Sequence, residues 1–168
     1  IRPETPRRSP ETTMKLLHSI KLLYGDNVDI YTFGCNELEN IIQSYTKSFD
    51  FTHFGILNSS QLASLFNNTH IFIDMSLFQA MGLTGMEAMA CNNAVILPKH
   101  GGANEFIKDS YNGFLVDTIH DEECLKVVDN LMNDRLLLTS IAKEAVKDIC
   151  QYSPYFSSKN ILDYLFKS

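Results

Sequence analysis

The segment from Gln79 to Cys91, QAMGLTGMEAMAC, combines glycines, a threonine and one carboxylate in a way that could hold a phosphate-bearing ligand. Gly82 and Gly85 permit tight turns and close approach of a ligand to the backbone. Helix formers follow, and a helix N-terminus offers N–H groups and partial positive charge to an anion. The segment is neither the GxGxxG pattern of dinucleotide folds nor a P-loop. From the glycines alone, a strand-to-helix turn without a ligand is an equally good interpretation.

Glu87 makes the ligand interpretation more specific. We expect this carboxylate in the first turn of a helix. The helix is otherwise apolar from Met86 to Cys91, so we expect it to be buried. A buried carboxylate needs hydrogen-bonding partners. The vicinal hydroxyls of a ribose suit one carboxylate, because it can accept both of their hydrogens in a planar arrangement. Together, the loop and Glu87 therefore indicate a nucleotide.

The tightest cluster of positive charge lies at the start of the chain, at Arg2, Arg7 and Arg8. Because the net charge of the chain is -6, the cluster suits a small anion better than a nucleic acid, whose partners usually present a basic face. A solvated basic end is the alternative. The four cysteines are widely spaced without a CxxC pair, and the histidines are not at ligand spacing. We therefore expect no metal site, no disulfide and a reducing compartment.

These residues need a scaffold, and alternating helix and strand patterns predict an α/β protein with a doubly wound, Rossmann-like parallel sheet. Parallel strands require crossover connections, which cover both faces of the sheet. Ligands of such sheets bind beyond the carboxyl ends of the strands. We expect Ser9 to cap the first helix and the stretch Asn58-Ser59-Ser60 to cap the third. The predicted strands are 28–33, 51–54, 70–75, 94–97 and 113–116, and the predicted helices are 10–24, 38–48, 58–66, 84–91, 103–108, 121–133, 135–150 and 157–166.

Length and composition favour one soluble domain over residues 1–168, with C-terminal helices from about residue 121. Hydrophobic residues make up 45% and charged residues 20% of the chain, which argues against disorder. No apolar run approaches the ~20 residues that a membrane-spanning helix needs. Ile1 is not an initiator methionine, so we expect this chain to be part of a longer protein.

Three motifs follow one another along the chain: EAMAC, then AVILP, then GGANE. In this order they resemble the C-terminal, donor-binding half of retaining glycosyltransferases with the GT-B fold, in the family 4 group also called glycosyl transferases group 1. The similarity runs from Arg2 to about Val116. The string RPETPRR also resembles the rhamnosyltransferase-like branch of bacterial polysaccharide enzymes.

The resemblance implies a site for a nucleoside-diphosphate sugar. Glu87 corresponds to the glutamate that holds the ribose. Gln79, eight positions earlier, stands where the family has a second glutamate that reaches the donor sugar. An amide can still contact sugar hydroxyls but supplies no negative charge, so no certain catalytic residue lies in this chain. The resemblance assigns Arg2 and Arg7 to the diphosphate, Gly82, Leu83 and Thr84 to the distal phosphate, Gly55 and Ile56 to the nucleobase, and Gly101 and Gly102 with Glu105 to the GGxxE element.

The activity implied is retaining transfer of a sugar, of the hexosyltransferase type and without metal or other cofactor, to a glycan or lipid-linked acceptor in bacterial polysaccharide biosynthesis. We expect a cytoplasmic location and no nucleic-acid partner. The acceptor and any peripheral membrane contact would depend on an N-terminal domain absent from this chain, so the isolated domain should bind donor weakly and transfer little. Two alternatives stay open: a non-catalytic nucleotide-binding module, which Gln79 permits, and a sugar-nucleotide 2-epimerase of the same fold.

Overall fold

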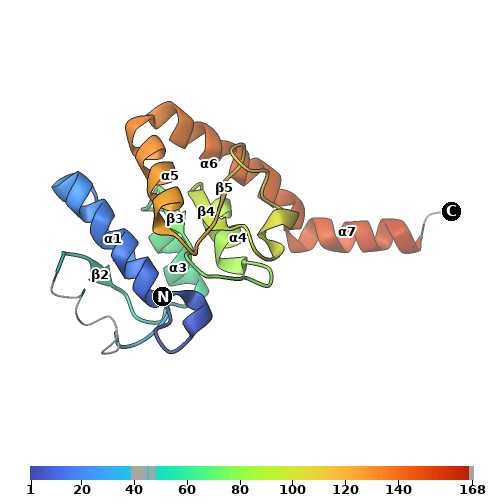
Figure 1. The fold of residues 1–168 in the computed structure, drawn as a ribbon. Helices are drawn as coiled ribbons and strands as arrows, with labels where there is room; N and C mark the ends of the chain where they lie inside the picture. Colours follow the sequence, from blue (N-terminus) through green and yellow to red (C-terminus); the bar gives the residue numbers. More distant parts are fainter. Residues whose placement is uncertain (39–44, 46–47, 167–168) are drawn as a thin grey trace.

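Short parallel strands alternate with helices along the chain (Figure 1). The computed structural model describes residues 1–38, 45 and 48–166, so the helix predicted at 38–48 lies largely outside the described residues. In chain order the elements are α1 (Pro10–Tyr24), β1 (Tyr31–Thr32), β2 (Thr52–His53), α3 (Ser59–Phe66), β3 (Ile71–Ile73), α4 (Leu83–Ala90), β4 (Ala94–Pro98), β5 (Phe114–Val116), α5 (Asp121–Asn133), α6 (Arg135–Ile149) and α7 (Pro154–Leu165), with 3-10 helices at Pro6–Arg8, Gly25–Asn27, Gly102–Glu105 and Cys150–Tyr152.

The strands form two hydrogen-bonded groups. β1 pairs with β2, and the other three strands are ordered β3-β4-β5. Every pairing is parallel, which confirms the predicted α/β class with parallel strands. Four strands, β1, β2, β3 and β5, are shorter than predicted, whereas β4 extends one residue further, to Pro98. The ladder of hydrogen bonds is interrupted between β1 and β3.

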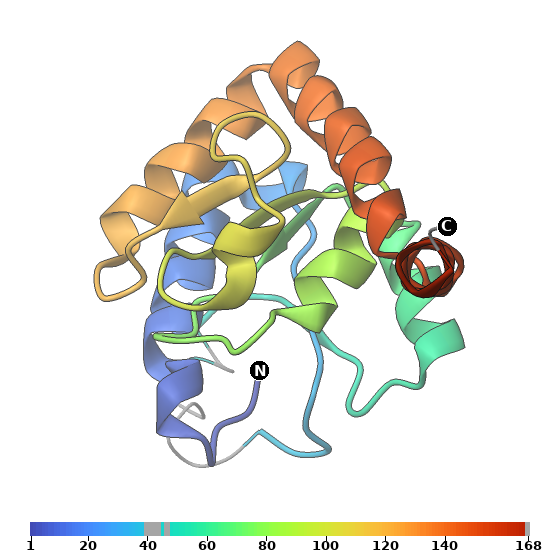
Figure 2. The same cartoon turned by 90° about the vertical axis from the view of Figure 1, so that its right-hand side faces the viewer.

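The core lies on both faces of β4, whose five residues are all buried. Ala94 and Ile96 face a cluster that includes α1 and α5, whereas Val95 and Leu97 face a cluster that includes α3 and α4. Successive side chains of a strand point to opposite faces, so a strand covered on both sides needs a continuous apolar run such as AVILP. Figure 2 shows the two helical layers, with α1 and α5 on one side of the strands and α4 and α6 on the other.

The two predicted helix caps have different outcomes. Asn58 caps α3 as predicted, because its Oδ1 accepts from Gln61 N and Gln61 Oε1 accepts from Asn58 N, each at 3.0 Å. The side-chain cap predicted for Ser9 is wrong. Ser9 has a left-handed backbone (φ 45, ψ 56), and its carbonyl accepts from Thr13 N at 2.9 Å. The chain therefore turns sharply at Ser9, between the 3-10 helix Pro6–Arg8 and α1.

The last helix, α7, extends away from the other elements (Figure 1). All of its residues from Pro154 to Leu165 are exposed, and none of them reaches the core. Within the described ranges, no helix combines the length and the apolar character that crossing a membrane requires.

Candidate functional site

Most of the predicted site residues lie in loops that follow the carboxyl ends of the parallel strands. The loop after β3 leads through Gln79 to α4, and the loop after β4 contains Gly101 and Gly102. Gly55 follows β2. Because parallel strands end at the same edge of a sheet, the fold brings these loops to one end of the molecule, as expected for this class.

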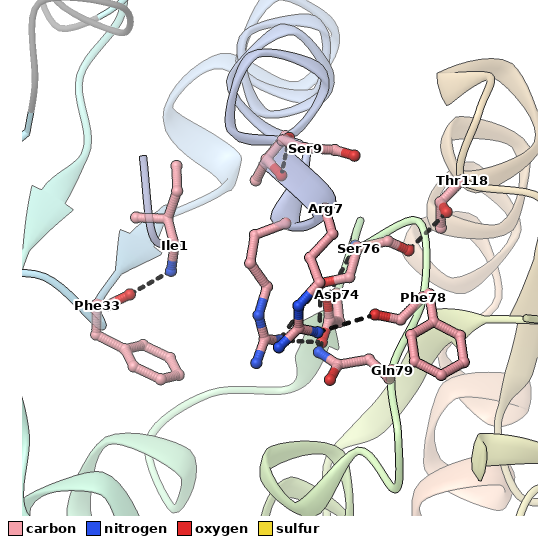
Figure 3. Close-up of polar contacts among 11 residues, drawn as sticks. Ile1, Arg7, Ser9, Phe33, Asp74, Ser76, Phe78, Gln79 and Thr118 are labelled. Carbon is pink, nitrogen blue, oxygen red and sulfur yellow. Dashed lines mark hydrogen bonds and ion pairs between the residues drawn. The ribbon is translucent and has the colours of Figure 1, made fainter. Parts of the chain in front are cut away.

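Asp74 organises the loop after β3. Its Oδ1 accepts from Ser76 N at 2.9 Å, and its Oδ2 accepts from Gln79 Nε2 (Figure 3). Arg8 Nη1 lies 3.5 Å from the same Oδ2, and the two side chains are only 24% and 13% exposed. Asp74 was not predicted as a site residue from the sequence. Its signal was a charged residue at the carboxyl end of an apolar strand pattern, the place where such sheets bind ligands.

Gln79 is bound to the protein through its amide nitrogen. The residue is 7% exposed, and besides Asp74 its Nε2 donates to Ser76 Oγ at 3.3 Å. Both hydrogens of the amide are thereby directed at the protein, which leaves the carboxamide oxygen to accept from a ligand. The contact between Gln79 and a donor sugar stays a prediction.

The three arginines have different surroundings. Arg7 is exposed, and its Nη1 donates to Phe78 O at 3.2 Å (Figure 3). The Arg7 carbonyl accepts from Leu77 N at 2.8 Å, which fixes the basic segment to the loop after β3. Burial lowers the pKa of Arg8, and the positive charges of Arg7 and Arg2 lower it further, while Asp74 opposes the shift. Arg8 is thus the structural member of the cluster, and Arg2 and Arg7 are its exposed members.

Gly82 begins α4 in a left-handed conformation, with φ 79 and ψ 41, which favours glycine. Its carbonyl accepts from Gly85 N at 2.9 Å and from Met86 N at 3.2 Å. The N–H groups of Leu83 and Thr84, the first two residues of the helix, have no acceptor within the helix and can serve an external one. With the helix dipole behind them, they suit an anion.

Two expectations about α4 are wrong. Gly85 does not admit a ligand: a Cβ there would lie 2.8 Å from Leu97 Cδ1, so this glycine allows α4 to pack against β4. Glu87 is the fifth helical residue rather than a first-turn residue, and it is exposed rather than buried. The burial argument therefore fails for Glu87. Its carboxylate is instead open to solvent, where a ligand can reach it.

Gly101 and Gly102 hold the loop after β3 in position. A Cβ on Gly101 would lie 1.9 Å from Gln79 O, and one on Gly102 would lie 2.0 Å from Ala80 O. Gln79 N donates to His100 O at 3.3 Å, and Gly102 N donates to Gln79 O at 3.0 Å. Two backbones meet here without room for a side chain. This packing accounts for the glycine pair, and a ligand contact by the pair stays a prediction.

The remaining predicted positions lie at the edges of this region. Gly55 has φ 68, its carbonyl accepts from Gly34 N at 2.8 Å, and Ile56 beside it is 65% exposed. Their contact with a nucleobase stays a prediction. Glu105 is exposed at the end of the 3-10 helix after β4.

A metal site would need several ligating side chains close to one another. In the part of the chain that the structure describes, no group of three or more His, Cys, Asp or Glu side chains is placed to hold a metal ion. His53 is engaged in contacts within the protein: its Nδ1 lies 2.9 Å from Thr32 Oγ1 and its Nε2 lies 2.9 Å from Cys35 O. Independence from metal stays a prediction.

Comparison with known proteins gives matches over most of the chain. Residues 13–148 match the family described as glycosyl transferases group 1. A sucrose synthase from Melioribacter roseus is 33% identical over 97 residues, which are 55% of this chain and 12% of that protein. The N,N'-diacetylbacillosaminyl-diphospho-undecaprenol alpha-1,3-N-acetylgalactosaminyltransferase of Campylobacter jejuni is 28% identical over 93 residues, 55% of this chain and 25% of that protein.

The structural comparison covers nearly the whole chain. The structure of Anabaena Alr3699/HepE in complex with UDP matches with a TM-score of 0.81 at 19% identity, over 98% of this chain and 46% of that one. This likeness confirms the predicted GT-B type of fold. The chain spans less than half the length of each of these three proteins.

Proposed function

Because the chain belongs to the glycosyl transferases group 1 family, we propose that it is the nucleotide-sugar-binding part of a GT-B glycosyltransferase. One observation carries the proposal: exposed cations and an open helix N-terminus occur on the same loop system. Arg7 is tied to the loop after β3 through Phe78, and that loop runs directly into the N–H groups of Leu83 and Thr84. Such an arrangement favours a compact, doubly charged anion.

Each feature has a distinct task in this proposal. The guanidinium groups of Arg2 and Arg7 present planar pairs of donors to the diphosphate, and the N-terminus of α4 adds fixed dipoles. Glu87, one turn into the helix and exposed, accepts from the ribose hydroxyls. The two arginines and the N-terminus of α4 neutralise the leaving diphosphate without a metal ion. Gly55 and Ile56 lie against the base, and Gly101 and Gly102 support Gln79 beside the sugar.

The reaction proposed is retaining transfer of a hexose-type sugar to a glycan or lipid-linked acceptor in the bacterial cytoplasm. The Campylobacter relative's name describes a diphospho-undecaprenol acceptor, which supports a lipid-linked acceptor as one candidate. The UDP complex of the Anabaena protein supports a nucleoside-diphosphate donor. Since the chain covers less than half of both proteins, the acceptor site belongs in this proposal to a further domain. The chain alone should bind donor weakly and transfer little.

The test is a calorimetric and thermal-shift panel of UDP-, GDP- and dTDP-sugars and their bare diphosphates against this chain. Arg7→Ala and Glu87→Ala should each weaken binding of the preferred nucleotide about tenfold or more, because each removes a charge-assisted contact. Glu122→Ala is the matched control, since it removes an exposed helical carboxylate from α5 and should leave binding unchanged. No saturable binding to the folded chain, or equal losses in all three variants, contradicts the proposal.

A non-catalytic nucleotide-binding role is the second candidate, and Gln79 is the observation that favours it. Its carboxamide is neutral, so position 79 supplies no negative charge to a developing positive centre. Its amide nitrogen is moreover bound to Asp74. A catalytic protein should prefer a nucleotide sugar to the bare diphosphate. A binding module should take both with the same affinity, and the panel above separates the two.

A further inference from the structure

The carboxamide of Gln79 is held in one orientation. Its Nε2 donates to Asp74 Oδ2 and, at 3.3 Å, to Ser76 Oγ. An ionised carboxylate only accepts hydrogen bonds, so the nitrogen of the amide, and not its oxygen, must face Asp74. In the part of the chain that the structure describes, no group donates to Gln79 Oε1. Figure 3 shows this oxygen on the side of the amide that lies away from Asp74.

Asp74 cannot turn to follow the amide, because both of its carboxylate oxygens are engaged. Oδ1 accepts from Ser76 N at 2.9 Å, which closes a local turn between the side chain and the backbone. Arg8 Nη1 lies 3.5 Å from Oδ2, and the Asp74 side chain is only 13% exposed. The acceptor offered to Gln79 therefore has a fixed position and little competition from water.

Ser76 supplies the second acceptor and is equally fixed. It is fully buried, and its carbonyl accepts from Thr118 Oγ1 at 2.7 Å. Its Oγ lies 3.3 Å from Gln79 Nε2 and 3.4 Å from Arg8 Nη1. Both N–H groups of the Gln79 amide thus meet acceptors that the protein holds in place. Turning the amide over would lose both bonds and bring its oxygen against a carboxylate, where two acceptors repel each other.

A glutamine held in this way recognises hydrogen-bond donors. Its oxygen is free to accept and its nitrogen has no hydrogen left to give, so the matching group on a ligand is a hydroxyl or an N–H. In the proposed function this group is a hydroxyl of the donor sugar. A sugar in which that hydroxyl is missing or methylated offers no hydrogen, and a site built around a substrate hydroxyl discriminates strongly against such analogues.

We propose that Asp74 is a positioning residue of the donor-sugar site: together with Ser76 it holds both N–H groups of Gln79, and position 79 therefore selects donors that carry a free hydroxyl there. This inference rests on the proposed function and deepens it, because it assigns the polarity of the sugar contact. The same carboxylate contacts Arg8, the neighbour of Arg7 in the chain, so Asp74 also links the sugar contact to the basic segment.

The first test needs no ligand, because Gln61 is a natural control within the chain. Gln61 is exposed and is bound through its oxygen, which accepts from Asn58 N at 3.0 Å. Exchange of the side-chain NH2 hydrogens with solvent, followed by NMR, should be about tenfold or more slower for Gln79 than for Gln61. Equal exchange would overturn the proposal, and this comparison requires no substitution.

Asp74→Asn should turn the Gln79 amide over. The oxygen of the new asparagine must accept from Ser76 N, which places its NH2 group against Gln79, and Gln79 then accepts through its own oxygen. The NH2 group of Gln79 would face the ligand and exchange as fast as that of Gln61. Continued slow exchange in a folded Asp74→Asn chain would overturn the role of Asp74.

The second test measures sugar preference, which is the Kd of a bare diphosphate divided by the Kd of its nucleotide sugar. The pairs are UDP with UDP-glucose, GDP with GDP-mannose and dTDP with dTDP-rhamnose. For the pair that binds, Asp74→Asn should lower the preference about tenfold, because position 79 no longer accepts from the sugar. Asp74→Asn combined with Gln79→Glu should restore it, since the new glutamate can accept from the new asparagine with one oxygen and from the sugar with the other.

A purely structural role of Asp74 would give a different pattern. It would weaken binding of the diphosphate and of the nucleotide sugar equally, and the double variant would not restore the preference. Either result would overturn the selection of a hydroxyl, as would equal affinities for both compounds in the unchanged chain. Absence of binding by all of these compounds, with slow exchange of the Gln79 amide, would refute the proposed function and still support the positioning of Gln79 by Asp74, so the two failures are distinguishable.

Discussion

Replacement of Gly101 by alanine should destabilise the protein through two separate effects. Gly101 has φ 127 and ψ -159, a region that only glycine adopts readily, and such strain costs about 1–3 kcal/mol. Its Cβ would also lie 1.9 Å from Gln79 O, so one of the two backbones must move. The movement disrupts the bonds from Gln79 N to His100 O and from Gly102 N to Gln79 O.

The expected magnitude follows from these two effects. Two backbone hydrogen bonds contribute about 0.5–1.5 kcal/mol each, which with the strain gives a loss of about 2–6 kcal/mol. Domains have a free energy of unfolding of about 5–15 kcal/mol, so the loss is a large fraction of the total. At about 2–4 °C per kcal/mol for a chain of this size, Tm should fall by about 4–24 °C.

Two further glycines separate the strain from the clash. Gly25 has φ 53 but nothing within 4 Å of a Cβ, so Gly25→Ala adds strain alone. Gly102 has no left-handed φ but a Cβ 2.0 Å from Ala80 O, so Gly102→Ala adds the clash alone. Differential scanning calorimetry should therefore give Gly101→Ala the lowest Tm of the three. If Gly101→Ala and Gly102→Ala are no less stable than Gly25→Ala, the close approach of the two loops is refuted.

Three more properties can be checked without a ligand. Asn93 is fully buried, and its Nδ2 donates to Phe66 O at 2.8 Å. Asn93→Ala should therefore lower the free energy of unfolding, measured by urea titration, by about 2–4 kcal/mol. An unchanged free energy of unfolding would refute the role of this amide. The hydrogen bond from Lys108 lowers the pKa of Asp148 below its ordinary value of 3.8. The stability that the ionised Asp148 contributes is therefore complete above pH 3.8 and is lost as the pH falls through the lowered pKa. Acid unfolding below about pH 4 should be shallower in Asp148→Asn, and identical pH profiles would contradict this reasoning. Burial raises the pKa of Cys124 to about 12, whereas Cys150 is exposed. A thiol reagent at about pH 8 should therefore modify Cys150 and spare Cys124 until the chain unfolds, as checked by peptide mass mapping.

Sequence periodicity predicted the helices and strands because each leaves its own pattern over several residues. The α/β class and the starts and ends of α5 are confirmed, since apolar spacing and a dense first turn of acidic residues mark them. The sharp turn at Ser9 was not predictable in this way. A serine at such a position is a weaker signal than the periodicity that marks a helix, because it is compatible with a side-chain cap and with a left-handed turn. Tertiary contacts of the basic segment decide between the two.

The candidate site was predictable where a residue type carries the signal and not where packing decides. Gly82 starts α4 with a positive φ, as a glycine at a strand-to-helix turn suggests. Gly85 looks identical in sequence, yet its neighbour is Leu97, twelve residues away and on another element. Exposure of Glu87 likewise depends on which face of α4 meets β4. The eight-residue helix has apolar residues on both sides of Glu87, so the sequence did not separate the two faces.

Asp74 gives a physical reason for an amide at position 79, where the resemblance leads one to expect a second glutamate. The Gln79 amide donates to the Asp74 carboxylate, and both side chains are mostly shielded from water. Two carboxylates in this contact would repel each other unless one of them took up a proton. Arg8 offsets only one negative charge, and it lies 3.5 Å from Asp74. The amide therefore lets the loop after β3 close around Asp74 at neutral pH. The negative charge of this site resides on Asp74, behind Gln79, and its carboxylate contacts both Arg8 and the Gln79 amide.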